Sequence, residues 1–169
     1  MVYRSSLPRY ANRQDLLTGV GSRIAGARWN PPGSFPTVYA SLDPHTALDE
    51  VLAHFRHYGL PIESAMPRVT ASIRVRLNKA LDFTDGANRS ALRVSSRRML
   101  EEPWRDKQAG GKEALTQALG RLAFNLGCEA LLVPSAARTN GINLILFPDN
   151  LSGASSMQIV NADDLPPRS

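Results

Sequence analysis

Residues 43–59 carry the clearest helical pattern in the chain, with apolar side chains three or four positions apart. At about 100° per residue, one face of this helix gathers Ala47, Leu48, Val51, Leu52 and Phe55. Asp43 is suited to cap the N-terminus, Pro44 to fill the first helical position and Gly59 to end the helix. Glu50 then lies on the flank of the apolar face, so the pattern predicts a carboxylate at the edge of the buried side.

Other segments have the patterns of strands. Residues 68–77 alternate strictly between apolar and polar side chains, which predicts a strand with one buried face. Short runs rich in β-formers predict further strands over 37–41, 129–134 and 142–148. A polar loop of turn-forming residues joins the last two, and 156–165 holds the pattern of a final strand.

Two further regions complete the predicted fold. Leucines at helical spacing over 112–127 predict a second helix that packs on the sheet and ends at Gly127. Residues 82–112 are polar and irregular, which predicts connecting structure at the surface with a short helix around 90–102. Strands outnumber helices without regular alternation, so we expect one α+β domain over 1–169 with a mixed, mainly antiparallel sheet. No Gly-x-Gly-x-x-Gly follows a strand, which disfavours a Rossmann site.

Composition sets the class of protein. With 169 residues and 43% hydrophobic residues, the chain is about the size of one domain with one core. A net charge of +5 favours an anionic ligand or partner, yet the arginines are scattered, so nucleic-acid binding stays open with little support. The chain shows no membrane-spanning run and no secretory signal, so we expect a cytoplasmic protein with no membrane contact.

Metal binding has weak support. Cys128 is the chain's lone cysteine, which excludes an internal disulfide and a cysteine-based zinc site. Glu50, His54 and His57 share one helix flank and could together ligate a metal ion, but a solvated flank explains them more simply. We therefore expect no metal site.

Four residues stand out as candidates for binding or catalysis. Arg28 lies in a Gly/Pro-rich loop, where its planar guanidinium suits a pyrophosphate, although most loop arginines are simply solvated. Tyr39 could pack in the core, or offer its ring face to a base while its hydroxyl remains available. Glu50 could equally be a solvated glutamate. Ser135 ends an apolar strand but lacks a Gly-x-Ser-x-Gly elbow, which disfavours an acylating serine.

Four segments carry a family resemblance, in this order: GARWNPPG, TVYAS, TALDEVLAH and LLVPSAARTNGINLILF. With them the chain resembles the RES domain, a family named for its arginine, glutamate and serine. The resemblance covers nearly the whole chain. Within these segments, Arg28, Tyr39 and Glu50 follow one another at eleven-residue intervals. It implies that Arg28, Glu50 and Ser135 are the name-giving residues and that Tyr39 is the accompanying aromatic. Arg4, in VYRSS, matches a further N-terminal arginine of the family.

This resemblance implies a fold like that of ADP-ribosyltransferases and a toxin, from a type II toxin–antitoxin pair, that uses NAD as substrate without a bound cofactor. Glu50 would stabilise positive charge on the ribose as the nicotinamide leaves. Arg28 and Arg4 would hold the pyrophosphate, Tyr39 would stack on the nicotinamide or its ribose, and Ser135 would orient the substrate through a hydrogen bond. The implied partner is an antitoxin with an Xre-like helix-turn-helix domain that covers the active site.

Several alternatives remain open at this point. Water, phosphate or a protein side chain could accept the ADP-ribosyl group, which would make the protein a glycohydrolase, a phosphorylase or an ADP-ribosyltransferase with a protein target. From other classes, the basic charge is also compatible with a nucleic-acid-binding or ribonuclease-type toxin, and the fold with a non-catalytic interaction domain.

Overall fold

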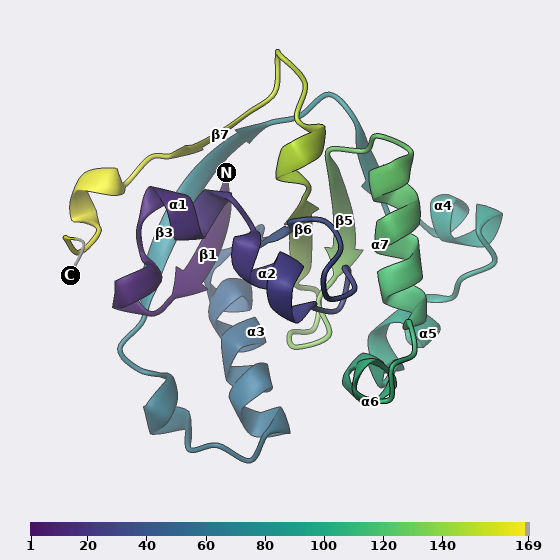
Figure 1. Cartoon of the computed structure of the whole chain (residues 1–169), viewed down its shortest axis with the longest axis horizontal. Helices are drawn as coiled ribbons and strands as arrows, with labels where there is room; N and C mark the ends of the chain where they lie inside the picture. The colour runs from purple at the N-terminus through teal and green to yellow at the C-terminus, as the bar shows by residue number, and fades with distance from the viewer. Residues whose placement is uncertain (168–169) are drawn as a thin grey trace.

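The computed structural model describes residues 1–167, and one seven-stranded sheet runs through them with helices on both faces (Figure 1). The strand order is β4-β5-β6-β2-β1-β3-β7. The strands are β1 (Val2–Ser6), β2 (Val38–Ser41), β3 (Val69–Arg76), β4 (Ala80–Asp82), β5 (Ala130–Pro134), β6 (Ile142–Leu146) and β7 (Ser156–Ile159). Within residues 1–167, only β4 and β5 pair in parallel, so the predicted α+β class with a mixed, mainly antiparallel sheet is confirmed.

The sheet separates two apolar cores because successive side chains of a strand point to opposite faces. On one face Leu131 and Ile145 pack with residues of α7 (Leu115–Asn125), a helix in the C-terminal half of the chain. On the other face Leu144 and Leu146 pack with Leu16 of the short helix α1 (Arg13–Leu17). The helices are α1 (Arg13–Leu17), α2 (Val20–Ala25), α3 (Pro44–His57), α4 (Gly86–Ala91), α5 (Ser96–Glu101), α6 (Trp104–Ala109) and α7 (Leu115–Asn125).

Helix α3 forms where the sequence predicted it. The Asp43 side chain accepts the backbone N–H of Thr46 at 2.9 Å, and Gly59 just beyond the C-terminus has the left-handed φ of 63°. The helix packs against β1, β2 and β6, but only Thr46 and Ala47 are buried. The other residues of the predicted apolar face, Leu48, Val51, Leu52 and Phe55, are half-buried, so this face is less deeply buried than its pattern suggests.

The strands predicted from sequence are present as β2, β3, β5, β6 and β7, whereas β1 and β4 were missed. Strand β1 lies inside the sheet between β2 and β3, yet only its end residues, Val2 and Ser6, are buried. Its sequence, VYRSS, therefore lacks the apolar alternation that identifies a strand.

The helical regions also differ from prediction in part. Helix α7 matches the predicted leucine pattern, and Gly127 follows it with φ 70°. The predicted short helix around 90–102 is replaced by α4 and α5, because Arg93 between them has a left-handed φ of 53°. Helices α1, α2 and α6 were not predicted. No helix of the described residues is long and apolar enough to cross a membrane.

Candidate active site

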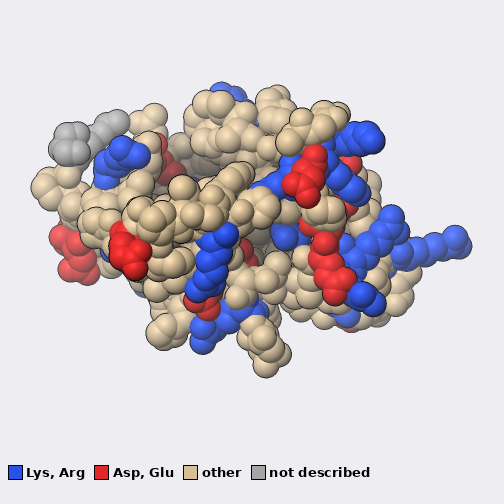
Figure 2. Space-filling model, turned by 90° about the horizontal axis from the view of Figure 1, so that it is seen from below, with Lys and Arg blue, Asp and Glu red and all other residues tan. Residues whose placement is uncertain are grey.

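A cavity of about 710 Å³ lies between α3 and the segments that carry Arg28 and α5–α6. Figure 2 looks at the molecule from below and shows a recess near the middle of this face with basic side chains on either side. The cavity is lined by four of the five candidate residues, Arg4, Arg28, Tyr39 and Glu50. The fold thus brings together residues that the sequence separates by up to 46 positions.

Glu50 is held by one of its two carboxylate oxygens. Its Oε1 accepts a hydrogen bond from Ser135 Oγ at 2.7 Å and another from Asn143 Nδ2 at 2.6 Å. No donor within residues 1–167 reaches Oε2. Since Glu50 lines the cavity, its second oxygen is available to a ligand while the first fixes the orientation of the carboxylate.

Ser135 acts on Glu50 and does not line the cavity described above. Its side chain is only 7% exposed, and its oxygen accepts the backbone N–H groups of Ala137 and Arg138, each at 3.1 Å. These two N–H groups point the hydroxyl hydrogen toward Glu50, because the oxygen acts as acceptor on its other side. The hydrogen bond expected from Ser135 is present, and its acceptor is the carboxylate.

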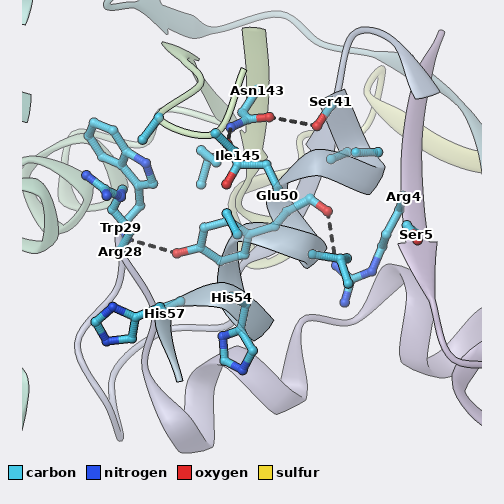
Figure 3. Close-up of a pocket in the computed structure, with 18 of the residues that line it drawn as sticks. Arg4, Ser5, Arg28, Trp29, Ser41, Glu50, His54, His57, Asn143 and Ile145 are labelled. Atoms are coloured by element: carbon cyan, nitrogen blue, oxygen red, sulfur yellow. Dashed lines mark hydrogen bonds between the residues drawn. The ribbon is translucent and has the colours of Figure 1, made fainter. Parts of the chain in front are cut away.

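Asn143 is a site residue that the sequence reasoning missed. Its amide oxygen accepts a hydrogen bond from Ser41 Oγ at 2.6 Å, and its amide nitrogen donates one to Glu50. Ser41, Asn143 and Glu50 are therefore linked by consecutive hydrogen bonds (Figure 3). A signal for it existed, because Asn143 is the one polar residue in the strand INLIL. An amide inside such a strand needs partners when buried.

Close packing sets the distance between α3 and the loop that carries Ser135. A side-chain carbon at Gly141 would lie 2.8 Å from Thr46 Oγ1, so only glycine fits at this contact. Thr46 is fully buried there, and the carbonyl of Gly141 accepts the Ser135 N–H at 2.8 Å. An ion pair between Arg138 and Asp49 at 2.7 Å adds a second tie. Together these contacts place Glu50 beside Ser135.

The loop that carries Arg28 is closed by a tight turn. Ala27 and Asn30 exchange backbone hydrogen bonds of 2.9 and 3.3 Å. The Tyr39 hydroxyl accepts the N–H of Trp29 at 2.9 Å and donates to Asn30 Oδ1 at 2.8 Å. The hydroxyl, which one of the two sequence interpretations left available for a ligand, is therefore occupied by the loop, while Tyr39 still lines the cavity. Burial raises the pKa of Tyr39, so the phenol stays neutral.

Helix α7 packs directly on this loop. A side-chain carbon at Gly120 would lie 1.8 Å from the carbonyl oxygen of Trp29, so the helix approaches the loop at a distance that only glycine allows. Gln117 adds a hydrogen bond of 3.0 Å from Nε2 to the carbonyl of Ala27. The loop is thus fixed between β2 and α7.

Arg28 is more than a solvated loop arginine. Its Nη1 donates to the carbonyls of Met99 at 2.7 Å and Leu100 at 3.3 Å, which ties the loop to α5. Burial lowers the pKa of Arg28, and the nearby Glu50 partly offsets this effect. The pKa of an arginine starts so high that the guanidinium remains charged.

Arg4 reaches the cavity from β1 on the other side of Glu50. Figure 3 shows Glu50 between Arg28 and Arg4. Arg4 donates from Nη1 to the Tyr39 carbonyl at 3.4 Å, a long contact. Burial lowers the pKa of Arg4, while the charge of Asp15 acts in the opposite direction. Two half-buried arginines therefore flank the carboxylate.

The mouth of the cavity adds residues that were not predicted as binding residues. Trp104 and Arg105 line it from α6, and Arg68 and His54 line it from the side of α3. Burial lowers the pKa of His54, with further contributions from the charges of Arg105, His57 and Arg68. His54 is thus neutral near pH 7. Among the described residues, no group of three or more His, Cys, Asp or Glu side chains is placed to hold a metal ion.

Comparison with known proteins finds a matching family, similar proteins and a similar solved structure. The sequence pattern that defines the RES domain matches residues 1–167. The chain is similar to the protein named NAD(+) phosphorylase MbcT of Mycobacterium tuberculosis and of Mycobacterium bovis, with 26% identity over 157 residues, which are 91% of this chain and 78% of the relative. Its fold is like that of a chain in the crystal structure of the M. tuberculosis MbcT–MbcA toxin–antitoxin complex, with a TM-score of 0.70, 23% identity and coverage of 97% and 87% of the two chains.

Proposed function

The chain belongs to the RES domain family, and from this membership together with the geometry of Glu50 we propose that it cleaves the nicotinamide–ribose bond of NAD. One observation carries the proposal. The Glu50 carboxylate, with one anchored and one available oxygen, lies in a cavity between the half-buried side chains of Arg4 and Arg28. The relative named as an NAD(+) phosphorylase supports the same substrate.

The chemistry fits this arrangement. Nicotinamide leaves NAD as a neutral base, so its departure needs no proton, and positive charge develops on the ribose as an oxocarbenium ion. An anion beside the ribose therefore lowers the barrier. Glu50 supplies that anion through Oε2, and Ser135 and Asn143 hold the carboxylate in place through Oε1.

The remaining residues bind the substrate. Arg4 and Arg28 offer guanidinium donors to the pyrophosphate, with Arg28 using the donors that are not bound to α5 carbonyls. Tyr39 and Trp29 line the cavity, and we propose that the nicotinamide or its ribose rests against this aromatic part of the wall. NAD is the substrate in this proposal, and none of these roles calls on a bound cofactor.

We propose that inorganic phosphate or water accepts the ADP-ribosyl group, with phosphate favoured by the name of the relative. The products distinguish the two, because water gives ADP-ribose and phosphate gives ADP-ribose 1″-phosphate. Transfer to a protein side chain would instead label a protein with ADP-ribose.

We also propose that the protein is the toxin of a toxin–antitoxin pair and that an antitoxin with an Xre-like helix-turn-helix domain covers the cavity. The solved complex with the similar fold contains an antitoxin, which supports this partner. Exposed apolar side chains beside the cavity mouth support a covering partner too, since Tyr58 is 56% exposed and Leu60 47%.

The test measures nicotinamide release from NAD by purified protein, with and without phosphate. Glu50→Gln keeps the size of the side chain and removes its charge, and we expect it to lower turnover by at least about a hundredfold. Glu101→Gln is the matched control, because Glu101 sits in an exposed ion pair with Arg97. In cells, the wild-type protein should lower NAD and arrest growth, and Glu50→Gln should do neither.

Two outcomes contradict the proposal. Wild-type turnover by Glu50→Gln would remove Glu50 from the reaction. Absence of nicotinamide release by the wild-type protein, together with RNA or DNA binding that weakens steeply with salt, would favour the nucleic-acid alternative.

A further inference from the structure

Arg105 has no ion-pair partner within residues 1–167. It lies near the start of α6 and lines the cavity with its neighbour Trp104, whose ring centroid is 4.5 Å from the guanidinium carbon. Its Nε is buried and has no hydrogen-bond partner within the part of the chain that the structure describes. A buried donor is normally paired, so an unpaired one in a cavity wall indicates a missing acceptor.

The placement of Arg105 is rigid because α6 is tied on both sides. Glu102, just before α6, accepts Lys107 Nζ at 2.7 Å and the backbone N–H of Thr116 in α7 at 2.9 Å. Gln108 donates to the carbonyl of Ala25 at 3.1 Å, at the entry to the loop that carries Arg28. Arg105 therefore faces the cavity from a fixed segment.

The positive charge around Arg105 also favours binding of an anion. Arg105 lies close enough to Arg28 and to His54 that its charge lowers the pKa of both. The carboxylate of Glu102 on the same segment is already bound to Lys107 and to the first turn of α7. The charges of Arg28 and Arg105 thus repel each other, and an oxyanion between these two arginines would relieve the repulsion.

Other arginines of this region differ from Arg105 in this respect. Arg97 and Arg98 on α5 are exposed; Arg97 donates its Nε to Glu101, and water can satisfy the donors of Arg98. Arg68, across the mouth, donates its Nε to the carbonyl of Ala65. Arg105 differs because it lines the cavity and its buried Nε has no hydrogen-bond partner within the described residues.

We propose that Arg105 forms a phosphate subsite at the outer part of the cavity, as a third arginine beside Arg4 and Arg28. The ligand class is a phosphate oxyanion, either the pyrophosphate of an adenine dinucleotide or the inorganic phosphate that accepts the ADP-ribosyl group. This inference rests on the proposed function and extends it to a residue that the sequence analysis did not single out. Arg105 binds one oxygen pair with its planar fork.

The cavity contains its own binding reporter. The chain has two tryptophans, Trp29 and Trp104, and both line the cavity, so intrinsic fluorescence responds to occupancy. Wild-type protein, Arg105→Ala and Arg105→Lys are titrated separately with ADP-ribose and with inorganic phosphate. Arg98→Ala is the matched control, because it removes the same charge from an exposed position. Calorimetric titration gives the same affinities without relying on Trp104.

We expect Arg105→Ala to weaken binding of at least one ligand by about tenfold, which corresponds to the loss of one charge-assisted contact. Arg105→Lys keeps the charge without the fork and should recover part of the loss. Weaker ADP-ribose binding identifies the pyrophosphate as the occupant. Weaker phosphate binding with unchanged ADP-ribose binding, and a raised KM for phosphate, identifies the acceptor.

The subsite and the reaction can fail separately. If Arg105→Ala and Arg105→Lys bind both ligands as tightly as the wild type, the subsite is refuted even if NAD is consumed. If the wild type releases no nicotinamide but its ADP-ribose binding depends on Arg105, the proposed reaction is refuted and the subsite stands.

Discussion

Ser135→Ala tests whether the serine serves the carboxylate or the substrate. The change removes the hydroxyl that donates to Glu50 Oε1 at 2.7 Å and leaves Asn143 as the remaining donor to that oxygen. The carboxylate then gains freedom to rotate away from the ribose. The backbone N–H groups that Ser135 accepted lie in a loop near the surface, where water replaces the lost acceptor.

The size of the effect follows from the contact that is lost. A hydrogen bond to a charged group contributes about 1.5–3 kcal/mol. Since the bond orients a group that acts on the transition state, the loss falls on kcat, and each 1.36 kcal/mol is about tenfold in rate. We therefore expect kcat to fall by about 10- to 100-fold with little change in the KM for NAD.

The assay is a double-mutant cycle on nicotinamide release. It compares the wild type, Ser135→Ala, Glu50→Gln and the double variant, each checked for folding by its thermal unfolding. If Ser135 acts through Glu50, adding Ser135→Ala to Glu50→Gln costs less than about threefold, because the carboxylate it served is already gone. Additive losses, or a raised KM with unchanged kcat, would show that Ser135 contacts NAD directly and would refute this reasoning.

Two further variants test the frame of the site. Arg28→Ala should raise the KM for NAD. It should also lower the free energy of unfolding by about 1.5–3 kcal/mol, because the Arg28 guanidinium donates to two α5 carbonyls and so holds the loop to that helix. An unchanged melting temperature would contradict this anchoring role. Glu129→Gln should destabilise the fold at neutral pH, because hydrogen bonds from Ser155 and its neighbours lower the pKa of Glu129 to about 2, below its unfolded value. That stability is present above the unfolded pKa and is lost as pH falls toward the folded one, so unfolding curves of Glu129→Gln and wild type should converge between about pH 5 and pH 2; a constant difference would contradict the assignment.

The parts of the fold that local pattern encodes were predictable. Helix α3 carries its own apolar stripe and both of its end signals, and strand β3 carries its own alternation, so each was found within a few residues. Strand β1 has no such pattern, because its place in the sheet comes from pairing with residues more than 30 positions away. Such pairing leaves no periodic signal in a five-residue segment.

The same contrast holds for the site. Arg28, Tyr39 and Glu50 were found because they stand in segments with a recognisable sequence, whereas Arg105 lies in a stretch that looked like polar connecting structure. Arg105 reaches the cavity because α6 is held in place by two contacts. Gln108 bonds the carbonyl of Ala25, and Glu102 bonds the backbone of Thr116, so both contacts join α6 to other segments of the chain. The role of a residue on such a segment depends on tertiary contacts that its neighbours in sequence do not determine.

The position of Glu50 along α3 explains why a helix flank, rather than a loop, provides the carboxylate. Thr46, Glu50 and His54 follow one another at four-residue spacing and so share one side of the helix. Along this line Thr46 is fully buried under Gly141, Glu50 is half-buried and His54 is exposed at the mouth. A carboxylate one turn deeper, at position 46, would be buried, and burial would raise its pKa and favour its neutral form. One turn further out, at position 54, water would screen its charge. Only the middle position lets the sheet hold one oxygen while the cavity receives the other.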